Sequence, residues 1–474
     1  MPVLDEAVVS AAHMKRPNLI LIILDTVRAH NVSCYVPSGA PTPTLEAFAS
    51  KGILFRNAFS NAVWTVPSHA TLFTGTYPTT HGALDLHRFL DPTYATMAEI
   101  LASAGYDTVG FSSNDFLSNK AFGLSRGFRL MEGPKYPRNN AERALRRLYR
   151  IATRTEDCGA SSAHLFVNRW LRSRKTFAKP FFMFLNYMEA HAPYIHIPRR
   201  DLATHLSPQQ RQRFPLIDQD RQKYLTRSAD IEPTDFDILR SVYNAQISYL
   251  DRTINRLLDL LNREKVLDRS LVIITSDHGD MIGEHGLMHH SYCLYEELIK
   301  VPLLLKLPGR EGNDSERDEL VSLVDLFPTV LDVLEIDDRP FASQIQGLSL
   351  LARDILARRS YIFSECERPK NEFAETYPLF DFSVYDRQLL AIRSSRYKFI
   401  WASDGRHEFY DLVKDPGEQN NLIAVGGEVL NRLREDLLRW YDSLPKRDRE
   451  ATPSLAGPDL DREVTKRLRA LGYF

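Results

Sequence analysis

Several segments of this chain are continuously apolar and end at polar residues that can carry chemistry. The first is LILIIL, residues 19–24, which is followed directly by Asp25. An apolar run without alternation is typical of a central strand of a parallel sheet, because such a strand is covered on both faces. The side chain that follows the run then lies at the carboxyl edge of the sheet, where ligands bind in open α/β folds.

Further apolar runs alternate with helical patterns along the chain. Residues 243–266 predict a helix, because apolar residues recur there at helical spacing from Ile247 to Leu261, and residues 320–336 predict another. Buried strands are predicted within residues 93–113, 179–194, 269–280 and 300–309. Strands that alternate with helices predict an α/β fold with a large, mostly parallel sheet and helices on both sides of it.

The pattern changes after about residue 350. Short strands separated by turns are predicted within residues 358–366, 388–403 and 407–421, and a helix is predicted within residues 426–444. This combination is typical of a small α+β domain. We therefore predict a catalytic domain of residues 1–350 and a C-terminal α+β domain of residues 351–474.

The charge balance and the cysteines exclude some classes of protein. The chain has 60 Lys and Arg against 61 Asp and Glu, a net charge of −1, so it lacks the basic field of a nucleic-acid-binding protein. No apolar run is long enough to span a bilayer or resembles a signal peptide. The four cysteines form no Cys-x-x-Cys pair, which argues against a thiolate metal site or a disulfide framework. We expect a cytoplasmic protein with neither a nucleic-acid partner nor a membrane span.

The segment AVWTVPSHATLFTG, residues 62–75, predicts a helix that begins near Thr65. Pro67 suits the first turn of a helix, and the final Thr-Gly suits its end. Free backbone N–H groups and the positive end of the helix dipole collect at such a start, which favours an anion. Thr65 is therefore either a residue of an anion site or an ordinary helix cap.

Polar residues also follow two of the other predicted strands. Glu189 and His191 follow the strand within residues 179–194, and Asp277 and His278 follow the strand within residues 269–280. Carboxylate and imidazole groups together predict a site for a divalent cation. Glu189 has a second interpretation as the structural partner that orients His191, and a second metal ion held by Glu189 and the histidines stays open.

A glycine-rich segment, GDMIGEHGLMHH, follows the Asp-His pair and contains His285, His289 and His290. We expect one of these histidines to face the site and the others to lie at the surface, because a lone histidine is often only a surface residue. Thr26 and Arg28 follow Asp25 closely and are candidates either to contact the substrate or to brace the turn. The hydroxyl of Thr26 is too weak a donor to replace a carboxylate ligand.

These motifs, in this order, resemble the sulfatase family of the alkaline-phosphatase superfamily. The resemblance runs nearly from end to end through LILIILDTVRAHNVSCY, TPTLEAFASKGILFRNAFS, TVPSHATLFTG, YPTTHG, TSDHGDMIGEHGLMHH, LYEELIKVPLLLKLPG, RSSRYKFIW and FYDLVKDPGEQNNL. It implies an alkaline-phosphatase-like sandwich, in which helices flank a large, mostly parallel sheet and a small C-terminal α+β domain carries an antiparallel sheet.

The chain departs from the family pattern at several positions. Thr65 stands where sulfatases have the Cys or Ser that is oxidised to formylglycine, and the methyl group on its Cβ prevents it from forming that aldehyde. The resemblance also places His69 at an Arg position, Thr26 at a frequent Asp position, His278 at an Asn position and His290 at a Lys position. An unmodified threonine beside an Asp-His pair is similar to the phosphoryl-transfer branches, the nucleotide pyrophosphatase/phosphodiesterases and the phosphoethanolamine transferases.

The resemblance therefore implies a metal-dependent hydrolase of phosphoric mono- or diesters, or a phosphoryl-group transferase, with Thr65 as direct nucleophile. Asp25, Asp277 and His278 would hold the cation together with the Thr65 oxygen. Imidazole in the ligand set favours Zn or Mn over Ca, which prefers oxygen ligands. Bound to a cation, the hydroxyl becomes a better nucleophile, and water or an acceptor alcohol then releases the group from phospho-threonine.

Three histidines would support this reaction. We expect His191 and His290 to contact the transferred group or to protonate the leaving oxygen, and His69 to steady Thr65 or the anion. The substrate would be a small anionic ester. The polar segment 201–225 and the basic helical segments 138–155 and 168–175 are either solvated surface or a lid that selects that substrate.

Two other functions remain as alternatives. The first is a sulfuric-ester hydrolase that works without formylglycine, and the second is a catalytically degenerate binding protein that kept the fold. Retention of Asp25, Asp277 and His278 argues against the second, because a protein without chemistry has little need of three converging ligands. Whether the chain forms a homo-oligomer stays open.

Overall fold

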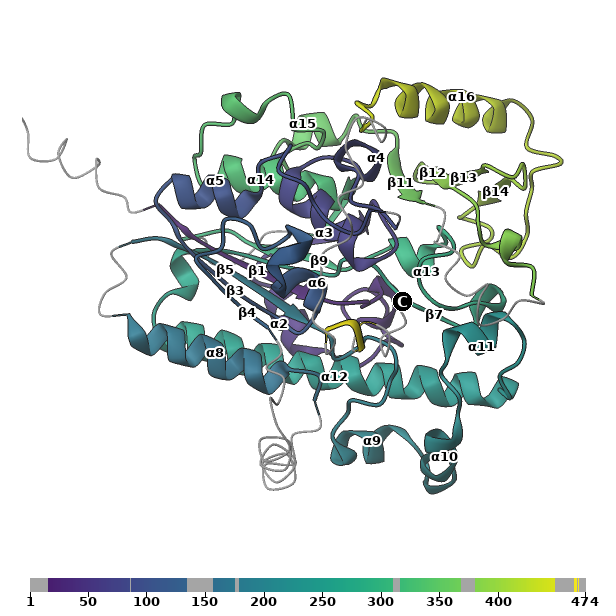
Figure 1. Ribbon diagram of the computed structural model, residues 1–474, viewed down its shortest axis with the longest axis horizontal. Coiled ribbons are helices and arrows are strands. Elements are labelled where there is room, and N and C mark those ends of the chain that lie inside the picture. The colour runs from purple at the N-terminus through teal and green to yellow at the C-terminus, as the bar shows by residue number, and fades with distance from the viewer. Residues whose placement is uncertain are drawn as a thin grey trace, which may run out of the picture.

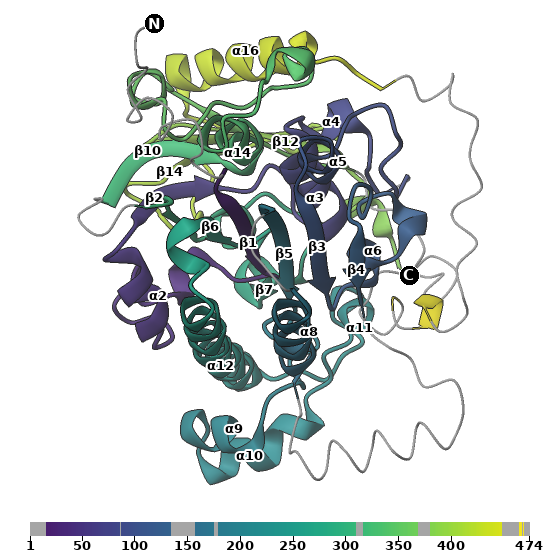
Figure 2. The ribbon, with the colours of Figure 1, turned by 90° about the vertical axis from the view of Figure 1, so that its left-hand side faces the viewer.

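The computed structural model describes residues 16–85, 87–133, 157–174, 179–309, 316–367, 380–447, 464–466 and 468. Its main feature is a sheet of eight strands. Its members are β1 (Asn18–Leu24), β2 (Ile53–Phe59), β3 (Asp107–Ser112), β4 (Leu130–Glu132), β5 (Phe181–Tyr187), β6 (Ser270–Thr275), β9 (Leu303–Lys306) and β10 (Glu316–Ser322). The strands lie side by side in the order β10-β2-β9-β6-β1-β5-β3-β4. Figure 1 shows the sheet, and Figure 2 shows its strands from β10 at one side to β4 at the other.

The sheet is mostly parallel. Strand β1 pairs in parallel with β5 and with β6, and the remaining adjacent pairs are parallel except those that involve β9. Strand β9 runs antiparallel to both of its neighbours, β2 and β6. The carboxyl ends of the central strands β6, β1 and β5 therefore meet at one edge of the sheet, as the fold class predicted from the sequence requires.

Helices cover both faces of the large sheet (Figures 1 and 2). The helices are α2 (Pro43–Ala49), α3 (Thr65–Thr74), α4 (Pro78–His81), α5 (Met97–Ser103), α6 (Asp115–Ser118), α8 (Ala160–Ser173), α9 (Arg199–His205), α10 (Pro208–Arg213), α11 (Arg221–Leu225), α12 (Pro233–Arg263), α13 (Glu296–Ile299), α14 (Leu326–Val333), α15 (Arg353–Leu356) and α16 (Gly427–Ser443). Helices α8 and α12 cover one face, and α3, α5 and α14 cover the other.

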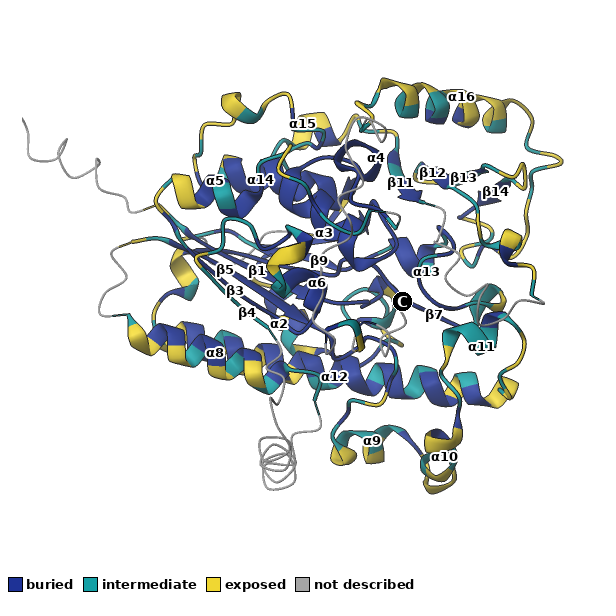
Figure 3. Cartoon of the chain, viewed as in Figure 1, coloured by how far each residue is buried: buried dark blue, intermediate teal, exposed yellow. Residues whose placement is uncertain are grey.

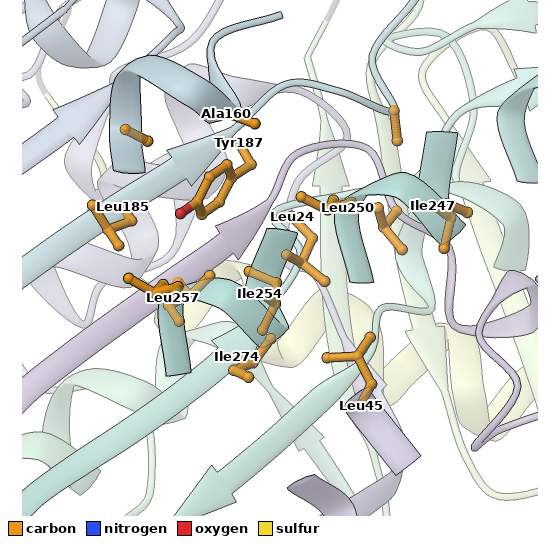
Figure 4. Close-up of a cluster of buried hydrophobic side chains, with 14 of the residues drawn as sticks. Leu24, Leu45, Ala160, Leu185, Tyr187, Ile247, Leu250, Ile254, Leu257 and Ile274 are labelled. Carbon is orange, nitrogen blue, oxygen red and sulfur yellow. The ribbon is translucent and has the colours of Figure 1, made fainter. Parts of the chain in front are cut away.

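The alternation of β1 explains why both faces are apolar. Ile20, Ile22 and Leu24 pack into the cluster with α8 and α12, whereas Leu19, Leu21 and Ile23 pack into the cluster with α3, α5 and α14. Figure 4 shows part of the first cluster, where Leu250, Ile254 and Leu257 of α12 meet Leu24 and Ile274. Each fully buried side chain of this size contributes about 1.5–3 kcal/mol, so the central strand anchors the layer order.

A second, smaller sheet follows the large one in the sequence. Its antiparallel strands β11 (Ile362–Cys366), β12 (Leu389–Arg393), β13 (Tyr397–Ala402) and β14 (Glu408–Asp411) lie in that order. One face of this sheet packs against Leu433 and Leu437 of α16, whose outer side is exposed (Figure 3). The other face packs against Phe59, Leu298 and their neighbours in the larger part of the molecule. The boundary between residues 350 and 351 stays a prediction.

The structure differs from the elements predicted from the sequence at one predicted helix and at one strand that was not predicted. The pattern within residues 320–336 predicts one helix, but Leu320, Val321 and Ser322 belong to β10 and pair with β2, and helix α14 begins only at Leu326. Strand β2 is not among the strands predicted from apolar runs, because Arg56 and Asn57 interrupt it and are partly exposed. A short apolar stretch does not by itself distinguish a strand from a helix. Pairing with a distant strand determines which of the two it forms.

The polar segment 201–225 folds into α9, α10 and α11, and α9 packs against α12. The two-residue strands β7 (Met281–Ile282) and β8 (Met288–His289) form a hairpin next to α11. The basic segment 138–155 lies outside the described residues, whereas residues 168–173 form the end of α8. In the described parts of the chain, no helix combines the length and the apolar character that a membrane span requires.

Candidate active site

The candidate residues gather at the carboxyl edge of the large sheet. Asp25 follows β1 directly, His191 lies in the loop after β5, and Asp277 and His278 follow β6. Thr65 is the first residue of α3, with Trp64 as N-cap in an extended conformation and Gly75 as C-cap in the left-handed region at φ 70°. The helix predicted to begin near Thr65 is therefore confirmed.

Asp25, Asp277 and His278 form a buried cluster that fits a divalent cation. One ligand atom from each residue lies within 4.8 Å of the others. Asp25 Oδ1, Asp277 Oδ2 and His278 Nε2 have no hydrogen-bond partner among the described residues. Buried polar atoms are nearly always satisfied, and two carboxylate oxygens with one imidazole nitrogen are ordinary cation ligands. These three residues therefore fit the cation site predicted from the sequence.

Main-chain and side-chain groups hold the three ligands in place. Asp277 Oδ1 accepts hydrogen bonds from the N–H groups of Thr26 at 3.2 Å and His278 at 2.9 Å. Asp25 Oδ2 accepts one from Asn186 Nδ2 at 3.1 Å. His278 Nδ1 lies 2.7 Å from the carbonyl oxygen of Gly279, which can only accept, so Nδ1 carries the proton and Nε2 offers its lone pair.

Thr26 contributes its main chain to this arrangement and turns its side chain away. Its φ of 61° is unusual for a β-branched residue and directs its N–H toward Asp277. Its hydroxyl lies 2.7 Å from the carbonyl oxygen of Asp25 and 2.9 Å from that of Ala190. Since the hydroxyl is engaged there, the structure agrees with the expectation that Thr26 does not replace a carboxylate ligand.

The electrostatics of the cluster reflect two acidic groups in the interior. Burial, followed by the charge of Asp277, raises the pKa of Asp25 to about 6. Burial raises the pKa of Asp277 to about 7, although the N–H groups of Thr26 and His278 oppose that shift. A cation at this point offsets both effects, because it favours the charged form of each carboxylate.

His69 connects Thr65 to the cluster. Its Nδ1 atom lies 2.9 Å from the carbonyl oxygen of Thr65 and 3.6 Å from Asp277 Oδ2. Burial lowers the pKa of His69 to about 3, so the imidazole is neutral near pH 7. Of the two roles expected for His69, the contact with Thr65 agrees with steadying that residue.

His191 and His290 lie next to each other beside the cluster. The centres of their rings are 5.2 Å apart, and the ring of His290 is 4.6 Å from that of His278. His290 Nδ1 lies 3.0 Å from Asp280 Oδ1, and His191 Nδ1 contacts the carbonyl oxygen of Ala192. Of the three histidines in the glycine-rich segment, His290 is thus the one that the structure brings to the cluster.

The other two histidines of that segment lie away from the cluster, although His289 is buried and not at the surface as expected. His285 stacks on the ring of Tyr295 at 3.8 Å, and His289 Nε2 lies 3.0 Å from the carbonyl oxygen of Gln219. Glu189 also lies away from the ligand cluster. Its Oε1 accepts a hydrogen bond from the N–H of Ala160 at 2.7 Å, so Glu189 caps the start of α8, which differs from both roles considered for it in the sequence.

Three further residues, which were not predicted from the sequence, contact the candidate site. Asn114, in the loop after β3, donates a hydrogen bond to Thr65 Oγ1. Asn186, near the carboxyl end of β5, donates one to Asp25 Oδ2. Asp280 contacts His290 through its Oδ1 atom. The position of Asn114 just beyond a predicted strand was the available signal, because the carboxyl-edge rule applies to that strand as well. Asn186 lies within an apolar run, and nothing in the run indicates which way its side chain points.

Comparison with known proteins agrees with the fold and with the resemblance to the sulfatase family. A family model described as Sulfatase matches residues 17–336, and one described as N-sulphoglucosamine sulphohydrolase, C-terminal, matches residues 283–442. The uncharacterized sulfatase YidJ of Escherichia coli is 24% identical over 458 residues, which cover 91% of this chain and 88% of that protein. Arylsulfatase K of Bos taurus is 24% identical over 471 residues, which cover 91% and 82% of the two chains.

Solved structures share the fold. The phosphonate monoester hydrolase of Agrobacterium radiobacter superimposes with a TM-score of 0.66 at 22% identity, covering 90% of this chain and 96% of that one. A protein solved in complex with its substrate D-glucosamine-2-N,6-O-disulfate superimposes with a TM-score of 0.69 at 20% identity, covering 92% and 100%. At these identities the similarity establishes the architecture of the chain.

Proposed function

This chain belongs to the sulfatase family of hydrolases, and from that premise we propose that it is a metal-dependent hydrolase or transferase of phosphoric esters whose nucleophile is the unmodified hydroxyl of Thr65. The observation that carries the proposal is the position of His69. Its Nδ1 atom contacts both the main chain of Thr65 at 2.9 Å and the proposed ligand Asp277 at 3.6 Å, so the first turn of α3, which carries Thr65, packs against the proposed cation cluster.

Thr65 is suited to attack by its place in the fold. It is fully buried at the start of α3, a ten-residue helix whose first N–H groups have no helical partner. The positive end of the helix dipole favours the anionic ester and the charge that develops on its oxygens. When bound, the divalent cation would lower the pKa of the threonine hydroxyl and offset the charge of the ester.

The reaction would have two displacements. In the first, a bond forms between Thr65 Oγ1 and phosphorus while the bond from phosphorus to the leaving oxygen breaks. In the second, water or an acceptor alcohol attacks phosphorus and releases Thr65. His191 and His290 lie beside the cluster and are the groups we assign to contact with the transferred group or to proton donation to the leaving oxygen.

Zn or Mn is the cation that the donor set favours. The cluster of Asp25, Asp277 and His278 contains an imidazole nitrogen, and the hydroxyl of Thr26 is turned away from it. Calcium prefers a shell of six to eight oxygen ligands, which these residues do not supply.

A sulfuric-ester hydrolase is the second candidate, and the names of relatives favour it. Arylsulfatase K of Bos taurus is named for sulfate esters, and one solved structure with the same fold contains a sulfated glucosamine as its substrate. Against this candidate, a threonine that receives a sulfo group has no easy route to release it, because it lacks the second hydroxyl of a hydrated aldehyde. The fold alone does not decide between the two esters.

Metal analysis combined with a substrate panel tests the proposal. The panel contains an aryl phosphate monoester, an aryl phosphodiester, an aryl phosphonate and an aryl sulfate, with the Thr65→Ala variant as control. The proposal expects bound Zn or Mn and turnover of a phosphorus ester that Thr65→Ala abolishes. Turnover of the aryl sulfate alone would reverse the ranking of the two esters, and the absence of bound metal and of all turnover would favour a binding protein.

The cytoplasmic location stays part of the proposal.

A further inference from the structure

The side chain of Asn114 contacts the oxygen that the proposed function makes reactive. Asn114 lies two residues after β3 and directly before α6, and α6 packs beside α3 (Figure 1). Its Nδ2 atom lies 3.2 Å from Thr65 Oγ1, and both residues are fully buried. The contact joins residues 49 positions apart, so it is a product of the fold rather than of local sequence.

The hydrogen-bond network fixes which end of the Asn114 amide faces Thr65. Its Oδ1 atom lies 3.1 Å from the backbone nitrogen of Phe116, which can only donate. The oxygen of the amide is therefore committed to the start of α6, and the NH₂ group faces Thr65. The backbone of Asn114 is held as well, because its N–H donates to Ser112 Oγ at 2.9 Å.

The same network reaches the cation cluster. Ser112 Oγ lies 3.0 Å from Asn186 Oδ1, and Asn186 Nδ2 donates to Asp25 Oδ2 at 3.1 Å. Ser112 therefore holds both the backbone of Asn114 and the side chain of Asn186, which in turn contacts Asp25. The distance between the amide and Thr65 Oγ1 is consequently set by rigid elements and not by a mobile loop.

We propose that Asn114 is a catalytic residue that stabilises negative charge on Thr65 Oγ1 by donating a hydrogen bond to it. This inference rests on the proposed function, because Oγ1 reacts only if Thr65 is the nucleophile. An amide NH₂ group donates and does not accept, so the Thr65 hydroxyl cannot give its proton to Asn114. One lone pair of Oγ1 faces the amide, and the hydrogen bond strengthens as that oxygen becomes charged.

The donor acts in both displacements. In the first, the hydroxyl proton passes to solvent, the bond between Oγ1 and phosphorus forms, and the bond to the leaving oxygen breaks. In the second, water forms a bond to phosphorus, the bond between phosphorus and Oγ1 breaks, and Oγ1 takes up a proton again. Charge resides on Oγ1 before the first step and returns to it in the second, and Asn114 stabilises it each time.

Substitution by Asp separates this role from the capping role of the same side chain. Asn114→Asp keeps an oxygen that caps Phe116, but it replaces the NH₂ donor with a negatively charged acceptor. Asn114→Ala removes both groups. Asn119→Asp is the matched control, because the Asn119 side chain accepts a hydrogen bond from the N–H of Ala121 at 3.0 Å at the other end of α6 and contacts none of the described site residues. All variants are compared by melting temperature, by kcat and KM on bis(4-nitrophenyl) phosphate, and by affinity for orthovanadate.

The inference expects Asn114→Asp to lower kcat by about 10²–10³-fold with a smaller change in KM, and to weaken vanadate affinity by about tenfold or more. It also expects Asp to be no better than Ala at this position, although Asp preserves the cap. A purely structural role gives the reverse order, with Asp more active than Ala, and that result would overturn the inference.

Two further outcomes keep this inference distinguishable from the proposed function. If wild type is active, Thr65→Ala is inactive and Asn114→Asp behaves like Asn119→Asp, the inference is wrong and the proposed function stands. If wild type turns over no ester and binds no vanadate, the proposed function is wrong and the inference fails with it. Should Asn114→Asp not fold, the Asn114→Ala variant carries the test: unchanged kcat and vanadate affinity would contradict the inference.

Discussion

The Nε2 atom of His278 lies 3.4 Å from Oδ2 of Asp277, and neither atom has a hydrogen-bond partner among the described residues. Both side chains are fully buried. The other nitrogen of His278 and the other oxygen of Asp277 are held by the main chain. Two neighbouring ligand atoms are therefore presented side by side by a rigid loop, which is the arrangement that the cation in the proposed function requires.

Asp277→Asn tests this arrangement. The substitution keeps the size of the side chain and removes its charge, so we expect bound metal to be lost and kcat/KM to fall by about 10²-fold or more. Loss of a residue that only hydrogen-bonds to a metal ligand already costs up to about 10²-fold, and loss of a ligand should cost at least as much. Elemental analysis and activity with added Zn or Mn measure the two effects. Asp268→Asn, at the exposed opposite end of β6, is the control and should change neither. Full activity of Asp277→Asn without bound metal would contradict the cation site.

Asp280 is expected to act through His290. Its Oδ1 lies 3.0 Å from His290 Nδ1, and its Oδ2 accepts a hydrogen bond from the Tyr194 hydroxyl at 2.6 Å. Asp280→Asn should lower kcat by about tenfold or more, because the ring of His290 loses its charged partner. The double variant Asp280→Asn/His290→Gln should have a kcat only slightly lower than that of His290→Gln alone. Kinetics of the two single variants and the double variant test this, and strictly additive losses would show that Asp280 acts independently.

Glu189 should make stability depend on pH. Burial raises its pKa to about 8 from the ordinary 4.5, so the folded protein keeps the proton that the unfolded chain releases between these values. The stability contributed by this group is present below pH 4.5 and is lost as pH rises toward 8, by at most about 1.4 kcal/mol per pH unit. Glu189→Gln keeps the cap on α8 and should flatten this part of the profile. Chemical denaturation from pH 4 to pH 9 measures the difference, and parallel profiles for the two proteins would contradict it.

The pair of Arg28 and Glu284 should hold the loop after β1 against the segment that follows the ligands. Arg28 Nη1 and Nη2 lie 3.0 Å and 3.1 Å from the two carboxylate oxygens of Glu284, and the side chain of Arg28 is only 7% exposed. Arg28→Met should destabilise the protein by about 1.5–3 kcal/mol, because it leaves the mostly buried Glu284 carboxylate with only the longer ion pair to Arg240 at 3.5 Å. Arg28→Met combined with Glu284→Met should recover part of that loss. A single variant as stable as wild type in thermal melting would contradict this account.

The layer order of the fold could be predicted because burial on both faces leaves a clear mark in the sequence. Strands β1, β5 and β6 are continuous apolar runs, and α12 shows apolar residues at helical spacing. Strands β2 and β10 lie at one side of the sheet and carry polar residues such as Arg56 and Asp318, so their local pattern is ambiguous. The position of these two strands in the sheet is fixed by their pairing with each other across some 260 residues. A local sequence pattern does not indicate such a distant pairing.

The candidate site could be predicted in part for a related reason. Asp25, Asp277 and His278 each follow a recognisable strand, and the carboxyl-edge rule then brings them together. The partners behind them could not be found in this way. Asn114, Asn186 and Asp280 are defined by where their side chains point, and Glu189 lies in the expected loop but turns to the start of α8. Side-chain direction depends on packing between distant segments, and one sequence does not contain it.

Mass spectrometry of the protein during turnover tests the central claim most directly. Wild type is mixed with an aryl phosphodiester, quenched in acid within one turnover, digested and compared with Thr65→Ser and Thr65→Ala. The account predicts an unmodified Thr65 before mixing, a phosphoryl adduct on the peptide of residue 65 in wild type and in Thr65→Ser, and none in Thr65→Ala. Turnover by wild type with no adduct on Thr65 at any quench time, or full activity of Thr65→Ala, would contradict the account.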